Sequence, residues 1–196
     1  MTNKSIFITG GAGYAGSRLV PQLIDKGYNV TVYDIMYFGS DFLPKSKNLN
    51  IIEGDIRDTQ KLESACKDHD IFLNLACISN DTSFAIDEKL STSVNLDAFE
   101  PMVLAAKRSK IRRFIYASSS SVYGESKKFP LKEKGHTSPK NIYGYSKLIN
   151  EKIADYYSRI YNINSIGLRF FTVFGPWGRP DMFILKLLNK NKNNQV

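Results

Sequence analysis

Tyr143 and Lys147 stand four residues apart in the segment YGYSK, at the start of a long stretch with helical apolar periodicity. On a helix, this spacing places both side chains on one face about one turn apart, so the ammonium group lies near the phenol. A tyrosine phenol ordinarily has a pKa of about 10, too high for a base at neutral pH, and a nearby positive charge favours the phenolate. The pair therefore predicts a proton acceptor at Tyr143. A tyrosine that only packs in the helix is the alternative.

Four consecutive serines, residues 118–121, follow an apolar run and precede Val-Tyr-Gly. A hydroxyl at the carboxyl end of a parallel strand lies at the edge where ligands bind, and there it can donate to an oxygen that gains charge. Taken alone, the run is more typical of a polar loop than of a catalytic site.

A glycine-rich turn, TGGAGYAG at residues 9–16, directly follows the first apolar run and opens a helical segment. Such a turn lets the backbone approach a pyrophosphate, which then binds the free amides of the helix N-terminus. Asp34 ends the next strand, 18 residues after Gly16, near the roughly 20 expected for a carboxylate that binds the adenosine ribose. That carboxylate would repel a 2′-phosphate, so NAD is predicted rather than NADP. An aspartate that caps a turn is the alternative.

These groups are spread over a chain in which apolar strands alternate with helical segments. The alternation predicts parallel βαβ units, and therefore an α/β fold with a Rossmann-type, doubly wound parallel sheet. We predict strands at 4–9, 29–34, 50–53, 70–75, 112–117 and 164–171, and helices at 14–26, 58–67, 87–109, 142–160 and from about 181.

Composition excludes several classes of protein. The 196 residues, 42% hydrophobic, suit one globular domain, and neither a signal peptide nor 18 consecutive apolar residues is present, so we expect a cytoplasmic protein without a membrane partner. The net charge of +8 is scattered, which favours a surface that attracts anionic ligands over a nucleic-acid site. The two cysteines and two histidines lack metal-ligand spacing, so no metal site is expected.

The glycine spacing resembles the TGxxGxxG turn of the extended short-chain dehydrogenase/reductase family, whose members modify nucleotide sugars. Asp55-Ile56, Leu75-Ala76 and Asn95 match further motifs of this branch, and the resemblance covers essentially the whole chain. It implies that NAD is bound by Gly10, Gly13, Tyr14, Ala15, Gly16, Asp34, Asp55, Ile56, Leu75, Ala76, Asn95, Tyr143 and Lys147.

The family carries a catalytic Ser or Thr three positions before Val-Tyr-Gly, which is Ser119 in this chain. The resemblance implies that Ser119 donates to a sugar oxygen, Tyr143 takes its proton, and Lys147 also holds the nicotinamide ribose. The related 4,6-dehydratases carry Asp-Glu where this chain has Ser120 and Ser121, which are then expected to contact substrate. Serine is a poor proton shuttle, so epimerisation at C4 through a 4-keto-sugar is favoured over dehydration.

The segment 168–182 resembles UDP-glucuronate 4-epimerases, most clearly in Gly-Arg-Pro-Asp-Met. Arg179 is expected to pair with a C6 carboxylate and Thr172 to hydrogen-bond it, although Arg179 binding a diphosphate is an alternative. The segment 79–101 lacks the Gly-Thr usual in those enzymes. We therefore predict epimerisation of a UDP-sugar, with UDP-hexuronate as substrate. The alternatives are a dehydratase or oxidoreductase of the same family, or an NAD-binding protein without turnover.

The resemblance also predicts how the chain is organised. Residues 1–180 are expected to form the NAD-binding Rossmann domain that carries the catalytic residues, and residues 181–196 to begin a truncated substrate-binding region whose larger part is missing. A homodimer is implied through helices 87–109 and 142–160, with Phe99, Met102, Val103 and Ile153 in the interface. The alternative is that these side chains face the sheet.

Overall fold

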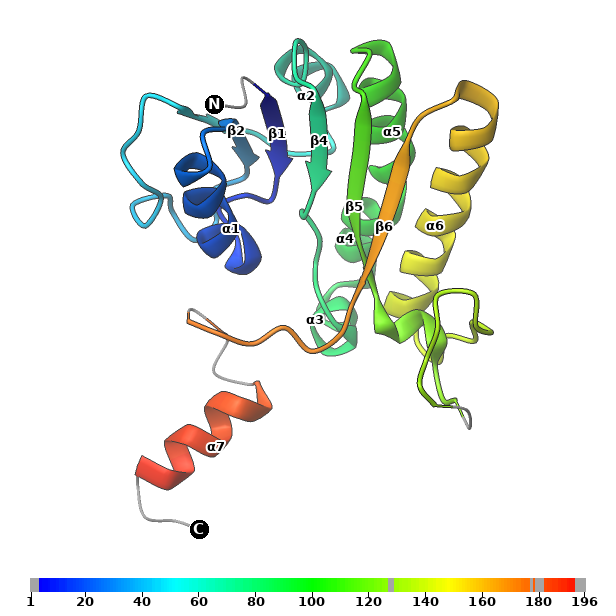
Figure 1. Cartoon of the computed structure of the whole chain (residues 1–196). Helices are drawn as coiled ribbons and strands as arrows, with labels where there is room; N and C mark the ends of the chain where they lie inside the picture. The colour runs from blue at the N-terminus through cyan, green and yellow to red at the C-terminus, as the bar shows by residue number, and fades with distance from the viewer. Residues whose placement is uncertain (1–3, 127–128, 177, 179–181, 193–196) are drawn as a thin grey trace.

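The computed structural model describes residues 4–126, 129–176, 178 and 182–192. Six parallel strands form one sheet in the order β3-β2-β1-β4-β5-β6, which is the strand order of a Rossmann fold and confirms the predicted fold class (Figure 1). The strands are β1 (Ser5–Thr9), β2 (Asn29–Asp34), β3 (Leu49–Glu53), β4 (Ile71–Asn74), β5 (Arg113–Ser119) and β6 (Ser165–Phe170).

Helices and short turns connect these strands. They are α1 (Tyr14–Asp25), α2 (Thr59–Ala65), α3 (Asp81–Ile86), α4 (Glu88–Thr92), the π-helix η1 (Ser93–Asp97), α5 (Phe99–Arg108), the 3₁₀ turn η2 (Ser120–Tyr123), α6 (Ile142–Tyr161) and α7 (Phe183–Lys192). Within the described part of the chain, none of them combines the length and the apolar character that crossing a bilayer requires.

The sheet separates two hydrophobic cores, because successive strand residues point to opposite faces. On one face, Phe7, Phe72 and Phe114 pack under α2, α5 and α6. On the other face, Ile8 and Val32 pack under α1. Helix α1 covers β1 and β2 on this face. Ile166, Leu168 and Phe170 of the edge strand β6, in contrast, remain 37–38% exposed.

The helix predicted at 87–109 is interrupted, and a further helix, α3, precedes it. Asp87 caps α4 by accepting a hydrogen bond from the Leu90 N–H, and the chain then widens into η1 before α5 begins. Pro101 supplies the reason: it cannot donate to the carbonyl four residues earlier, and its ring crowds that carbonyl. Proline is favoured in the first turn of a helix, and α5 accordingly begins at Phe99, two residues before Pro101.

The apolar side chains predicted to form a dimer interface lie inside the protein. Phe99, Met102 and Val103 are at most 1% exposed and pack against the sheet, and Ile153 lies partly buried against the same core. Phe99 makes edge contacts with the rings of Phe114 and Tyr116. The prediction for these residues was therefore wrong. An apolar stripe is needed to pack a helix on its own sheet, so the stripe alone does not indicate a dimer interface.

The carboxyl ends of all six strands meet at one edge of the sheet, as parallel pairing requires. After β6, residues 171–176 run beneath this edge toward the start of α1 (Figure 1). There the Tyr14 hydroxyl donates to the Gly175 carbonyl oxygen over 3.4 Å. The helix α7 follows and lies away from the sheet (Figure 1).

Candidate functional site

The glycine-rich turn forms a cradle at the N-terminus of α1. Gly10 has φ +71°, and a Cβ there would lie 2.4 Å from the Ala76 nitrogen, while a Cβ at Gly16 would lie 2.1 Å from the Gly11 carbonyl oxygen. Gly13 is the N-cap of α1, and no side chain in the described ranges caps it. The backbone amides at Tyr14 and Ala15 therefore begin a helix with no competing side chain, which suits an anion.

Asp34, at the carboxyl end of β2, is bonded to this turn. One carboxylate oxygen accepts from the Ala12 N–H over 2.9 Å, and the other accepts from the Met36 N–H over 3.0 Å. The structure thus shows the turn-capping contact, and binding of a ribose stays a prediction. A carboxylate oxygen can accept a second hydrogen bond, so the two roles are compatible.

Tyr143, Lys147 and Ser119 come together beside the carboxyl end of β5. Asn141 caps α6 by accepting from the Gly144 N–H over 2.7 Å, which fixes Tyr143 in the first turn of the helix. The Lys147 ammonium group donates to the Ala117 carbonyl oxygen over 3.1 Å and lies 5.7 Å from the centre of the Tyr143 ring. Both side chains are more than 90% buried.

The turn that follows Ser119 packs directly against the start of α6. A Cβ at Gly144 would lie 2.9 Å from the Ser121 carbonyl oxygen, so only glycine allows this approach. The Ser119 Oγ accepts from the Ser121 N–H over 3.1 Å, which leaves the hydroxyl hydrogen of Ser119 able to donate elsewhere. Ser120 and Ser121 are half-buried in η2 at the same edge.

The other predicted cofactor residues are held by the protein itself. The Asn95 side chain accepts from the Ile78 N–H and donates to the Ile78 carbonyl, each over 2.8 Å, so it braces the loop after β4. The Asp55 carboxylate is paired with Arg57, whose hydrogen bonds hold the pKa of that carboxyl below its usual value. Ile56 is buried, whereas Leu75 and Ala76 are partly exposed where β4 ends.

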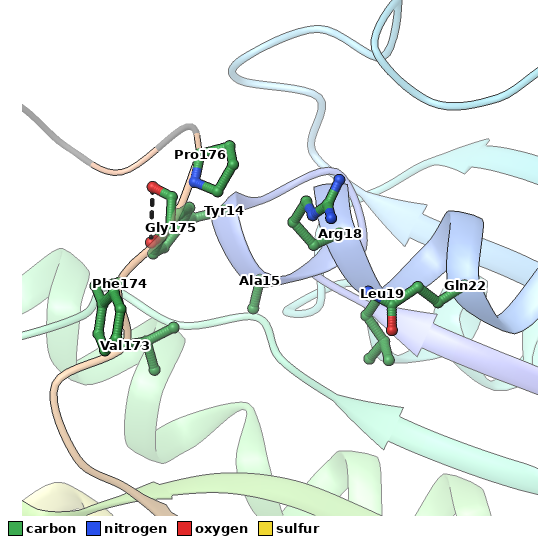
Figure 2. A pocket seen from close by; sticks show the side chains of 9 residues that line it. All are labelled: Tyr14, Ala15, Arg18, Leu19, Gln22, Val173, Phe174, Gly175 and Pro176. Atoms are coloured by element: carbon green, nitrogen blue, oxygen red, sulfur yellow. Dashed lines mark hydrogen bonds between the residues drawn. The ribbon is translucent and has the colours of Figure 1, made fainter.

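The predicted sugar-binding residues are less defined. Thr172 is exposed in the segment after β6, and Arg179 lies outside the described residues. That segment and α1 enclose a pocket of about 340 Å³ next to the glycine cradle (Figure 2). Its walls are Tyr14, Ala15, Arg18, Leu19, Gln22 and residues 173–176.

Sequence reasoning missed an ion pair behind these groups, between Glu151 of α6 and Arg169 of β6. Arg169 Nε and Nη2 donate to the two carboxylate oxygens over 2.8 and 2.7 Å, and the side chains are 15% and 18% exposed for Glu151 and Arg169. Ser118 Oγ donates to the same carboxylate over 2.5 Å. The available signal was spacing, because Glu151 continues the four-residue series of Tyr143 and Lys147.

The ion pair sets the charge state of its members. Burial by itself raises the pKa of the Glu151 carboxyl, but hydrogen bonds from Arg169 and Ser118 outweigh it and hold this pKa below its ordinary value. Hydrogen bonding to Glu151 raises the pKa of Arg169. Tyr116 lies nearby, and burial together with the charge of Glu151 raises the pKa of its phenol. Glu151 is therefore a buried anion at neutral pH.

Comparison with known proteins assigns the chain to a family. A family profile described as the NAD dependent epimerase/dehydratase family matches residues 6–196. The chain belongs to that family. The chain is similar to the protein CapI of Staphylococcus aureus, with 32% identity over 97% of this chain and 60% of that protein, and to UDP-glucuronate 4-epimerase 4 of Arabidopsis thaliana, with 33% identity over 98% of this chain and 47% of that protein.

Solved structures of similar proteins show the same fold. A UDP-N-acetylglucosamine 4-epimerase from Methanobrevibacter ruminantium M1, in complex with UDP-N-acetylmuramic acid, is 31% identical with a TM-score of 0.92, over 100% of this chain and 65% of that one. A UDP-glucuronic acid 4-epimerase from Bacillus cereus, in complex with UDP-glucuronic acid and NAD, is 30% identical with a TM-score of 0.87, over 97% and 64%. The chain thus spans less than two thirds of these relatives.

Replacement of Glu151 by Gln is expected to make the free energy of unfolding less dependent on pH in the acidic range. Because the folded-state pKa of Glu151 is lowered, its stabilisation is fully present above the ordinary glutamate pKa of about 4.3 and is lost as pH falls through the folded value. The variant should be about 3 kcal/mol less stable at pH 7. Urea unfolding between pH 7 and 3 should show this difference shrink below about pH 4.3. A difference that stays constant over that range would contradict the assignment.

Proposed function

We propose that the protein binds NAD and epimerises a UDP-sugar at C4. The observation that carries this proposal is the meeting of Tyr143, Lys147 and the turn after Ser119 at the carboxyl edge that also holds the glycine cradle. Catalytic groups and a dinucleotide site at one edge of a Rossmann sheet are the arrangement that hydride transfer to a bound substrate needs.

The residues present fit NAD. The side-chain-free helix start at Gly13 suits the pyrophosphate, and Asp34 lies hydrogen-bonded to the same turn, where a ribose would follow. Bound NAD would accept the hydride from C4 of the sugar and, as NADH, would give a hydride back to the opposite face of the same carbon.

Each catalytic residue has a defined part in this proposal. Tyr143 takes the proton of the sugar hydroxyl, and Lys147, bonded to the Ala117 carbonyl, holds its ammonium group near the phenol ring. Ser119 donates its hydroxyl hydrogen to the oxygen on which charge develops. Ser120 and Ser121 offer no carboxylic acid or carboxylate for elimination of water, so the 4-keto-sugar is reduced again rather than dehydrated.

A UDP-hexuronate is our proposed substrate. Several relatives are named UDP-glucuronate 4-epimerases, and the segment that carries Thr172 and Arg179 resembles theirs. A guanidinium pairs well with a carboxylate such as the one at C6. In this proposal residues 1–180 supply cofactor binding and catalysis, and residues from 181 begin the substrate-binding region. A competition assay between UDP-glucuronate and UDP-N-acetylglucosamine tests this proposed substrate. Preferential turnover of UDP-N-acetylglucosamine would overturn it.

Asp34→Ala should weaken NAD binding more than tenfold, a loss of about 1.4 kcal/mol or more for a charged hydrogen bond. Asp34→Asn is the matched control, because it keeps an oxygen for the Ala12 or Met36 N–H and removes the charge. Isothermal titration calorimetry measures both variants. An affinity for NAD that is unchanged in Asp34→Ala would rule out ribose binding by this carboxylate.

Tyr143→Phe should lower turnover by about 10² or more with little change in NAD affinity, since it removes the proton acceptor and keeps the ring. Ser119→Ala should lower turnover by a comparable or smaller factor, because a donor rather than the base is lost. Tyr161→Phe is the control on the same helix, where the side chain is 39% exposed. Full activity of Tyr143→Phe in a coupled assay, with the unsubstituted protein active, would refute the mechanism.

We also propose a homodimer, through different residues of α6 from those predicted. Five apolar or aromatic side chains at helical spacing are 41–54% exposed on this helix and form one stripe: Ile142, Tyr145, Ile149, Tyr156 and Ile160. The opposite side of α6 faces the sheet. A second copy of the same helix would bury the stripe in a two-fold interface.

Ile149→Lys combined with Tyr156→Lys should convert the dimer to a monomer, because two charges would be buried in the interface. Ile51→Lys on the far edge strand β3, where Ile51 is 42% exposed, should leave the mass unchanged. Sedimentation equilibrium at micromolar concentration distinguishes the species. A monomeric wild-type protein, or a dimer that survives the double substitution, would contradict this interface.

A further inference from the structure

Three side chains of α6, at successive four-residue intervals, face the carboxyl end of β5. Tyr143 is the first, Lys147 bonds the Ala117 carbonyl, and Glu151 accepts from Ser118 Oγ. The helix is thus tied to two consecutive residues of the strand, and the next residue is Ser119. A shift of α6 along β5 would break both hydrogen bonds at once, so these bonds fix the position of Tyr143 along the strand relative to Ser119.

Arg169 extends these ties to two further elements. Besides its two bonds to Glu151, its Nη1 donates to the Glu133 carbonyl over 3.0 Å. Its guanidinium also lies 4.7 Å from the centre of the Tyr123 ring, which closes the turn η2. One carboxylate and one guanidinium therefore join α6, β5, β6 and the turn η2 that follows Ser119. We call Ser118, Glu151, Arg169 and Tyr123 the clamp.

The clamp is a poor device for stability alone. Both charged side chains are more than 80% shielded from solvent, and well-packed apolar residues in place of a buried ion pair are often equally stable or more so. Directional bonds, by contrast, allow only one alignment of helix and strand, which apolar contacts do not enforce. Ser118 adds to this, because its short hydroxyl reaches Glu151 only in the observed register.

We propose that Glu151, through Ser118 and Arg169, is a positioning residue that sets Tyr143 against Ser119 for catalysis. The inference rests on the proposed epimerase function for its kinetic consequence, but its structural content stands apart from that function. None of the clamp side chains needs to touch the substrate. Their effect is on the alignment of the two groups that do.

The deciding variant is Glu151→Met with Arg169→Leu, which removes both charges and keeps apolar volume. The matched control is Glu63→Met with Arg108→Leu, since Arg108 Nε and Nη2 also hold both oxygens of Glu63 at 2.8–2.9 Å, between α2 and α5 and outside the clamp. Thermal midpoints first show which variants fold as well as wild type. Ser118→Ala, which removes one tie and leaves the ion pair, is the graded third variant.

Kinetics with UDP-glucuronate and NAD should show kcat lowered at least tenfold in the clamp variant, KM changed less than threefold, and Ser118→Ala in between. The control should match wild type. Because the clamp variant is expected to keep its thermal midpoint, this loss separates positioning from folding. A kcat within twofold of wild type in a folded clamp variant would overturn the proposal.

Hydrogen exchange measured by mass spectrometry gives a second readout that needs no turnover. Amides of residues 119–123 should exchange at least tenfold faster in the clamp variant, while those of β1 and β4 stay unchanged. Unchanged exchange at 119–123 would also overturn the proposal. If wild type turns over no sugar, the proposed function fails and the exchange rates still decide the clamp. If the clamp variant does not fold, Ser118→Ala decides the proposal: a kcat lowered more than twofold together with faster exchange at 119–123 would support it, and a kcat within twofold of wild type or unchanged exchange would overturn it.

Discussion

Parallel pairing of six strands is the constraint on which the whole site depends. It brings the glycine turn after β1, Asp34 after β2, Ala76 after β4 and Ser119 at the end of β5 to one edge. Residues separated by more than a hundred positions in the chain thereby come to the same edge of the sheet. Local packing has only to adjust side chains over short distances.

That adjustment is made by backbone atoms that approach closely. Gly10 against Ala76 and Gly144 against Ser121 each leave no room for a Cβ. The first contact packs the glycine turn against the loop after β4, and the second packs α6 against the turn after β5. Packing therefore requires glycine at both positions, and any other residue there would displace the neighbouring backbone of the site.

Much of this was predictable from the sequence, for identifiable reasons. Strand and helix positions followed from apolar periodicity, and the parallel, doubly wound sheet followed from βαβ alternation. The pairing of Tyr143 with Lys147 was predictable because residues four apart on a helix lie on the same face, about one turn apart. The break at Pro101 was missed because periodicity was given more weight than the proline. The Glu151–Arg169 pair was missed because the partner of a charged residue depends on tertiary packing, here between α6 and β6.

The edge strand β6 has a consequence for handling the protein. Its outer backbone groups lie at the rim of the sheet, and its apolar residues Ile166, Leu168 and Phe170 are over a third exposed. A strand with these properties is a template for non-native pairing between molecules, and it favours aggregation when nothing covers it. Aggregates formed through β6 grow with concentration and time without reaching a fixed size, whereas a two-fold contact through α6 closes at two copies.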